Sequence, residues 1–151
     1  MTVVPSKRRP PEDGQITVLI VGFVLLSLLL ASVVMAASAV YLEHKKLLSL
    51  ADGAALAAAD SYMVGDIGGG GMPSPLLDDA RVVAATGSYL DASGAFSRHD
   101  RLAVAAGTGS EPGATAVVVL TAVAHPPVIS FLLPDGILIE ARSTARSRLT
   151  Q

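Results

Sequence analysis

The residues of this chain best suited to acid–base or metal chemistry are its three histidines. His44, His99 and His125 are separated by 55 and 26 residues, and none has a second metal-ligand type three or four positions away. Two ligands on one helix face need that short spacing, so the histidines predict no metal site. Arg98, His99 and Asp100 form a lone polar triplet, which we interpret as a solvated turn rather than a catalytic pair.

A phosphate site is the next chemistry to consider, because four consecutive glycines occupy 68–71. A phosphate-binding loop needs a preceding strand, a following helix and usually Lys-Ser/Thr, whereas Met-Pro follows here. The sequence also contains no HExxH, GxSxG or SxxK motif. We therefore expect no catalytic residue, no cofactor, no metal and no small-molecule substrate, and we interpret the glycines as a linker.

Composition excludes further classes of function. The chain has no cysteine, which rules out disulfides and thiolate metal sites. Its formal net charge is −2, it has no Trp, and its basic residues are scattered apart from 7–9 and 45–46. A nucleic-acid partner is therefore not expected.

One uncharged apolar run dominates the N-terminal part of the chain. Residues 15–42, 28 in all, include no Asp, Glu, Lys, Arg or His. As a helix this run would be about 42 Å long, against about 30 Å for the hydrocarbon core of a bilayer. The apolar region of a secretory signal covers only about 7–15 residues, so we predict a transmembrane helix. The stretch Ala37-Ser38-Ala39 resembles a signal-peptidase site, which leaves release after Ala39 as an alternative.

The flanking charges predict the orientation of this helix. Lys7, Arg8 and Arg9 lie in a short N-terminal tail, so we expect residues 1–14 to be cytoplasmic and the C-terminal domain to be extracytoplasmic. Lys45 and Lys46, just behind the span, are the competing charges. The predicted location is therefore the cell membrane, with a single pass through the lipid.

The helical pattern continues past the span as a predicted extension over 43–64. This stretch has no proline and is rich in Leu and Ala, which are strong helix formers. Spacings of four, three and four residues place a helix-packing face of small side chains on one side: Leu47, Ala51, Ala54 and Ala58. Such a face allows a second helix to approach closely, or alanine simply supports the helix. Gly53 would allow a closer approach or a bend.

A Gly/Pro linker is predicted over 65–75, followed by a small extracytoplasmic domain over 76–151. The domain should begin with a helix that has Pro75 in its first turn, Asp78 and Asp79 near its positive end, and a stop at Gly94. Its approximate apolar stripe is expected to comprise Leu77, Val82 (or Arg81), Ala85 and Tyr89.

Three strands are predicted after this helix, over 101–107, 114–125 and 137–146. The second is apolar on both faces, as expected of a covered central strand. The third alternates, with Ile139 and Ala141 on one side and Glu140 and Arg142 on the other. We therefore predict an α+β fold: a long N-terminal transmembrane helix that continues outside the membrane, then one or two helices packed on a short antiparallel sheet.

An apolar stretch lies between the last two strands. Residues 128–133 stand between Pro127 and Pro134, and a Pro-Asp-Gly turn closes the segment. Either this connection folds onto the sheet as part of the core, or it is an exposed docking lip for a neighbouring subunit or the membrane surface. The residues that would form the lip are Val128, Phe131 and Leu132.

These features together resemble a known family. A basic tail, "DGQITVL" at the start of a membrane helix, and "SLADGAALAAADSY" directly after it are similar to TadE/TadG-like proteins of the tight-adherence (Flp) pilus machinery, in particular the shorter actinobacterial type. The resemblance implies a pseudopilin-like or minor-pilin role without catalysis. Its implied partners are membrane lipid and other subunits of the pilus or secretion system, contacted through the N-terminal helix.

The resemblance also implies a candidate processing site between Gly14 and Gln15, where a prepilin peptidase would cut. Processed pilins usually carry Glu five residues after the cut, and this chain has Leu19 there. We therefore expect a retained anchor. The alternatives are an anchored extracytoplasmic binding or sensory domain unrelated to a filament, and a secreted domain released after Ala39.

Overall fold

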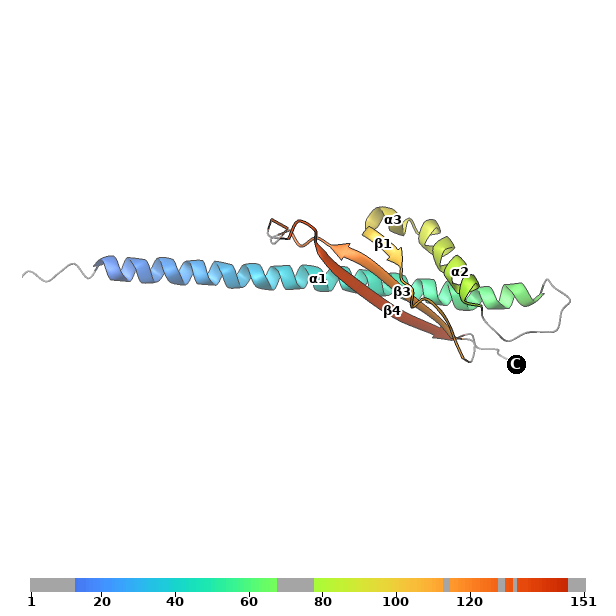
Figure 1. Ribbon diagram of the computed structural model, residues 1–151. Coiled ribbons are helices and arrows are strands. Elements are labelled where there is room, and N and C mark those ends of the chain that lie inside the picture. The colour runs from blue at the N-terminus through green and yellow to red at the C-terminus, as the bar shows by residue number, and fades with distance from the viewer. Residues whose placement is uncertain (1–12, 68–77, 113–114, 128–129, 132, 147–151) are drawn as a thin grey trace, which may run out of the picture.

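The computed structural model describes residues 13–67, 78–112, 115–127, 130–131 and 133–146. A single helix, α1 (Asp13–Ile67), runs for 55 residues, which corresponds to a rod about 80 Å long. The rest of the described chain lies along the C-terminal half of this rod (Figure 1). The α+β class is confirmed, because two shorter helices and a four-stranded antiparallel sheet follow α1.

Helix α1 continues without a break from the apolar run into the domain. No proline interrupts residues 13–67, and Leu and Ala dominate the second half, so nothing in the sequence favours a helix end at the membrane surface. The helix includes 65–67, the first residues of the predicted linker, and so runs further than expected. The rest of that linker, 68–75, lies outside the described residues.

Helix α2 (Asp79–Ala92) starts later than predicted. Asp78 is its N-cap, with a side chain that accepts a hydrogen bond from the backbone N–H of Ala80. Pro75 and Leu77, which were expected in this helix, lie outside the described residues. The predicted stop at Gly94 is confirmed, because this residue adopts a left-handed conformation with φ of 63°.

The buried face of α2 is rotated relative to the expected stripe. Val82 is buried as predicted, but Thr86 and Leu90 complete the innermost row, while Ala85 and Tyr89 lie at its border. After α2, the single-turn helix α3 (Ala95–Arg98) leads into the sheet.

The sheet is built around β3 (Thr115–Ala124). On one side β3 pairs with β4 (Ile137–Arg146) over the full length of both strands. On the other side it pairs with β1 (Asp100–Val104) and then with β2 (Gly109–Glu111), all antiparallel. The strand predicted over 101–107 therefore ends early, and β2 was not predicted.

Thr108 explains how β1 and β2 share one edge of β3. Its hydroxyl donates to the carbonyl of Val119 at 3.1 Å and accepts from the N–H of Val119 at 3.0 Å, in place of a strand residue. Ala105 N–H also donates to the Val119 carbonyl. Residues 105–108 therefore form a short irregular segment that interrupts the edge strand between β1 and β2.

The core lies between α1 and the sheet, and α2 packs against both of them (Figure 1). The predicted alternation in β4 is confirmed: Ile139, Ala141 and Ala145 are buried, and their neighbours Glu140 and Arg142 are exposed. From β3 the core receives every second residue, namely Ala116, Val118, Leu120, Ala122 and Ala124.

Candidate functional site

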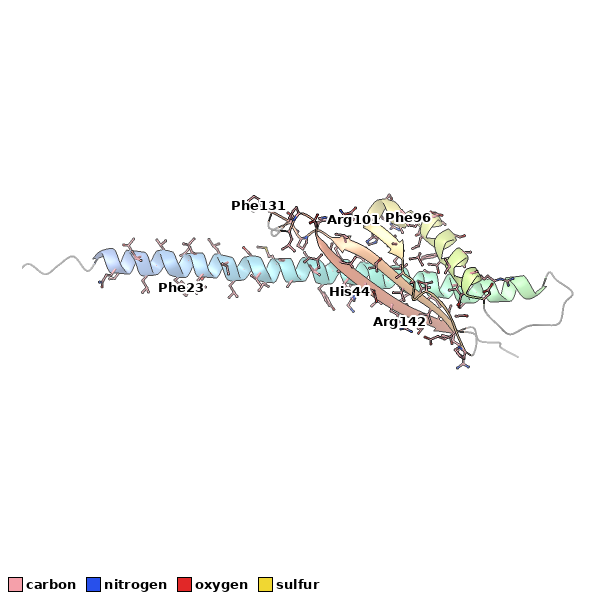
Figure 2. All side chains as sticks on the ribbon, in the orientation of Figure 1. Phe23, His44, Phe96, Arg101, Phe131 and Arg142 are labelled. Atoms are coloured by element: carbon pink, nitrogen blue, oxygen red, sulfur yellow. The ribbon has the colours of Figure 1, made fainter. Side chains whose placement is uncertain are left out.

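The first functional element is the exposed N-terminal half of α1. Among the described residues, α1 is the one helix long and apolar enough to cross a membrane. Large apolar side chains from Ile16 to Met35 are exposed all around the helix, as Figure 2 shows near Phe23. The hydroxyls of Ser27, Ser32 and Ser38 each donate a hydrogen bond to the backbone carbonyl four residues earlier. The helix therefore presents an apolar surface whose hydroxyls are already satisfied, as a lipid environment requires.

The candidate processing site lies at the start of this helix. Gly14 and Gln15 are exposed in the first turn of α1, which begins at Asp13. No atom comes within 4 Å of the position where a Cβ on Gly14 would lie, so packing does not require glycine there. The Gly14–Gln15 bond is in the part of a helix that frays most readily, which is where a peptidase would gain access to the backbone.

The predicted helix-packing face is covered by the chain itself. Leu47, Ala51, Ala54 and Ala58 have no exposed surface. Helix α1 contacts β3, β4 and α2 in this region, so the small side chains bring the sheet as well as a helix close to the α1 backbone. This face is therefore not available to a second protein while the domain is folded.

The Tyr89 side chain of α2 packs against α1 at Gly53. A Cβ on Gly53 would lie 2.1 Å from the Tyr89 hydroxyl oxygen and 2.7 Å from Cζ of the same ring. Because glycine has no side chain, the Tyr89 ring can lie directly against the α1 backbone at Gly53.

The connection between β3 and β4 carries the predicted docking lip. Phe131 is 93% exposed and Leu133 is 45% exposed, so neither contributes to the core. Val128 and Leu132 lie outside the described residues. The predicted Pro-Asp-Gly turn is confirmed by a hydrogen bond of 3.1 Å from the N–H of Gly136 to the carbonyl of Leu133.

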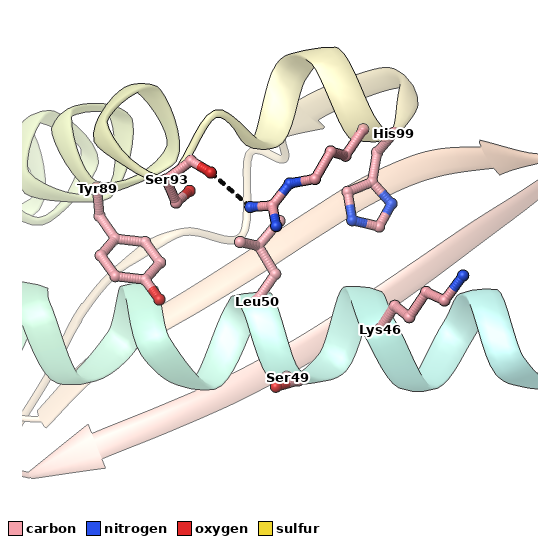
Figure 3. Close-up of a pocket in the computed structure, with 7 residues that line it drawn as sticks. Lys46, Ser49, Leu50, Tyr89, Ser93 and His99 are labelled. Atoms are coloured by element: carbon pink, nitrogen blue, oxygen red, sulfur yellow. Dashed lines mark hydrogen bonds between the residues drawn. The ribbon is translucent and has the colours of Figure 1, made fainter.

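The sequence did not predict a cavity between α1, the end of α2 and α3. It encloses about 640 Å³ and is lined by Lys46, Ser49, Leu50, Tyr89, Ser93, Arg98 and His99 (Figure 3). Arg98 donates to the backbone carbonyl of Ser93, and Lys46 Nζ lies 2.8 Å from Glu43 Oε1. Because both cations already have partners, the cavity is a weak anion site despite its basic lining.

His99 corrects our interpretation of the Arg-His-Asp triplet as a solvated turn. Its side chain is only 10% exposed, and its Nδ1 lies 3.9 Å from Oε2 of Glu43 on α1. Burial lowers the pKa of His99 below its usual 6.5, Glu43 opposes this shift, and Arg98 and Lys46 add to it. His99, between α3 and β1, therefore lies against α1, a position that only the three-dimensional contacts reveal, whereas Arg98 and Asp100 of the triplet are exposed.

The other histidines do not complete a catalytic or metal-binding group with His99. His125 Nδ1 lies 3.7 Å from Oδ2 of Asp100, and this pair connects the end of β3 to the start of β1. His44 lies on α1, partly buried. Within the described ranges no cluster of three or more His, Asp or Glu side chains could hold a metal ion.

The chain was compared with family models, curated proteins and solved structures. No curated protein and no solved structure matches the chain. A family model does match, the Tad model of Flp pilus-assembly TadE/G-like proteins, over residues 14–61. The matched stretch comprises the exposed apolar half of α1 and most of the half buried in the domain. Residues 14–61 are therefore similar to Flp pilus-assembly TadE/G-like proteins, in agreement with the resemblance noted in the sequence.

Proposed function

We propose that this chain is a membrane-anchored structural subunit of a Flp-type pilus or secretion assembly, pseudopilin-like or minor-pilin-like and without catalytic activity. The observation that carries the proposal is the continuity of α1. One helix is exposed and apolar over its first half and forms part of the domain core over its second half. A displacement of the membrane half is therefore transmitted to the domain without an intervening hinge.

In this proposal the retained anchor has its N-terminus in the cytoplasm and its domain on the extracytoplasmic side. Lys7, Arg8 and Arg9 support that orientation. Release after Ala39 is disfavoured, because that bond lies inside a continuous helix and Val40 packs against the core. The expected N-terminus of the mature protein is therefore Met1 or Thr2, whereas Gln15 would indicate pilin-like processing and Val40 would indicate secretion.

The surface proposed to meet other subunits is the exposed half of α1, because the small-residue face beyond it is covered by the domain. Large apolar side chains displayed all around a helix can pack on lipid or on other membrane helices. The folded domain then lies outside the membrane and takes no part in these contacts between helices.

A helix exchange tests the proposal against its main rival, an anchored binding or sensory domain. Residues 16–35 are replaced by an unrelated membrane span of the same length, which keeps the anchor and leaves the domain unchanged. We expect the exchanged protein to reach the membrane but to support no pili, as counted by electron microscopy of the producing cells.

The matched control exchanges a single exposed residue beyond the span, Leu56→Gln, and should leave pili at the wild-type number. Normal piliation with the exchanged helix would overturn the proposed role of α1 in assembly and favour the binding-domain alternative. Protease treatment of intact cells tests the orientation, because protection of the domain would contradict it.

A further inference from the structure

The surface of α1 changes character at one point along the helix. From Ile16 to Met35 its large apolar side chains are at least 48% exposed, and the next residue, Ala36, is only 6% exposed. Beyond Ala36, partly or fully buried positions recur on one face up to Ala59. The domain therefore begins to cover α1 at Ala36, within the run of uncharged residues.

This position coincides with the expected surface of the bilayer. Residues 16–35 make a helix about 30 Å long, which equals the thickness of the hydrocarbon core. If these residues fill the hydrocarbon, Ala36 lies at the boundary with the headgroups. The folded domain then rests directly on the membrane, with no length of bare helix between them.

Phe131, the one residue of the predicted lip that the structure describes, lies near this boundary. In Figures 1 and 2 the β3–β4 connection, with Phe131, lies at the end of the domain that faces the N-terminal half of α1. Gly136 closes the turn over residues 133–136: its N–H donates to the Leu133 carbonyl, its φ is +72°, and a Cβ there would clash with Val123 Cγ1. A fixed turn therefore presents Phe131 and Leu133 at the membrane end of the domain.

Exposed basic and aromatic groups suited to a headgroup layer lie behind the lip, on β1 and on α1 beyond Ala36. Arg101 follows Asp100, which pairs with Val123 near the end of β3, and its φ of 48° marks an irregularity in the register of β1. Its side chain is exposed and has no ion-pair partner within the part of the chain that the structure describes. On α1, Lys45 Nζ lies 5.6 Å from the centroid of the Tyr41 ring. Aromatic and basic side chains of this kind concentrate at membrane interfaces.

We propose that Phe131 and Leu133 insert into the boundary between headgroups and acyl chains of the leaflet on the domain's side, with Arg101 at the level of the lipid phosphates. The inference rests on the membrane anchor of the proposed function and adds a second lipid contact to it. The contact fixes the tilt and rotation of the domain on the membrane.

Lipid is a better occupant for this surface than a second protein chain. A stable protein interface buries about 1,200–2,000 Å² in total, far more than two exposed side chains can supply. Insertion into lipid needs no such area, because α1 already holds the lip at the bilayer and most of the entropy of association is lost before the lip binds. The acidic side chains at this end, Asp100 and Asp135, oppose strongly anionic membranes without preventing insertion of the apolar tip.

The absence of cysteine from the chain allows a direct test with single-cysteine labels. Ser130→Cys, beside the tip, carries an environment-sensitive NBD fluorophore in the full chain, which is reconstituted into vesicles of phosphatidylcholine and phosphatidylglycerol. A nitroxide near the top of the lipid acyl chain should quench this label about twofold, as expected for a group at the headgroup–acyl boundary. Leu56→Cys, an exposed site far along α1, should not be quenched.

The matched variant adds Phe131→Ser to the Ser130→Cys reporter and should abolish the quenching. Hydrogen exchange of β3 amides verifies that the sheet is unchanged, as the 93% exposure of Phe131 predicts. Equal signals from positions 130 and 56, or quenching that survives Phe131→Ser, would overturn the proposal. A spectral change at 130 that disappears when the protein is diluted in lipid would assign the lip to a second copy instead.

A label in the anchor separates failure of this inference from failure of the proposed function. Leu29→Cys lies in the exposed apolar stretch and should be quenched by a nitroxide deep in the acyl chains. Quenching at 29 without quenching at 130 would refute only the lip. Loss of quenching at 29 would refute the membrane anchor on which both proposals rest.

Discussion

The two halves of α1 have different side chains and opposite surroundings. In the first half, residues 16–35, large apolar side chains are exposed on every side. In the second half, residues 47–59, the buried positions are mainly alanine and the face packs on a sheet and a helix. Two features therefore distinguish the segment suited to lipid from the one built into the protein core: the first half is apolar on every side, and the buried face of the second half has mainly small side chains.

The physical reason is the distance at which each neighbour packs. Lipid chains adapt to any side chain, so size carries no penalty there and additional apolar area is favourable. A folded sheet is rigid and close-packed, so its distance from the α1 backbone fixes the volume that each α1 side chain can occupy. Alanine at Ala51, Ala54 and Ala58 permits a close approach of the sheet that leucine would prevent.

The largest effect that this comparison predicts is from Ala54→Leu. Ala54 has no exposed surface, so the added atoms must displace the sheet or α2, at a cost of about 2 kcal/mol or more in the free energy of unfolding. We would measure the cost by hydrogen exchange of β3 amides in the full chain embedded in nanodiscs.

The matched control is Ala31→Leu, the same change at an exposed position in the apolar half. We expect the β3 amides of this variant to exchange as in the wild type, because the larger side chain meets only lipid. If both substitutions accelerated exchange equally, the distinction between the two halves of α1 would be wrong.

Much of the fold could be predicted from the sequence because its elements carry strong local patterns. The alternation in 137–146 indicated which side of β4 is buried, and the apolar run of 114–125 indicated a central strand. By contrast, β2 has three residues without a pattern, and it depends on Thr108 bonding to Val119 across the sheet. Such a contact, eleven residues away in sequence, has no local signal.

The candidate site was predictable to a similar extent. The apolar stretch between Pro127 and Pro134 left two possibilities, a connection folded into the core or an exposed lip, and the exposure of Phe131 favours the second. The cavity was missed because its lining comes from three helices that are far apart in sequence or joined by short turns, including the cap residues Ser93 and His99. The beginning of the domain at Ala36 was also hidden, since the span of 15–42 has no change in composition there.

A smaller effect is expected where α2 crosses the buried half of α1. Gly53→Ala should lower the free energy of unfolding by about 1 kcal/mol, because the cost of displacing the Tyr89 ring exceeds the gain of about 1 kcal/mol in helix propensity. The same hydrogen-exchange measurement on β3 reports the change.

Repeating the substitution in a Tyr89→Leu background sharpens the result. Leucine does not reach the space in front of Gly53, so Gly53→Ala should then be stabilising by about 1 kcal/mol through helix propensity alone. This reversal of sign is specific to a contact between the two residues. A destabilising effect of the same size in both backgrounds would mean that Gly53 is needed for something other than the Tyr89 ring.

The smallest effect concerns pH at the boundary between the two halves of α1, where Glu43 of α1 faces His99. The pKa of His99 is lowered from 6.5 mainly by burial, with Glu43 raising it and Arg98 and Lys46 lowering it. Below pH 6.5 the unfolded chain therefore binds more protons at this site than the folded chain does. The free energy of unfolding should fall as the pH decreases through 6.5 and level off below the pKa of the folded state.

Two variants test which side chains cause this pH dependence. Hydrogen exchange of the β3 amides is measured between pH 7.5 and 5. His99→Gln removes the titrating group and should flatten the profile over this range. Glu43→Gln removes the carboxylate that favours protonated His99, so the pKa should fall further and the loss of stability on acidification should become larger. A smaller loss in Glu43→Gln would contradict the assignment, because it would mean that the carboxylate of Glu43, rather than burial of the imidazole, makes the domain sensitive to acid.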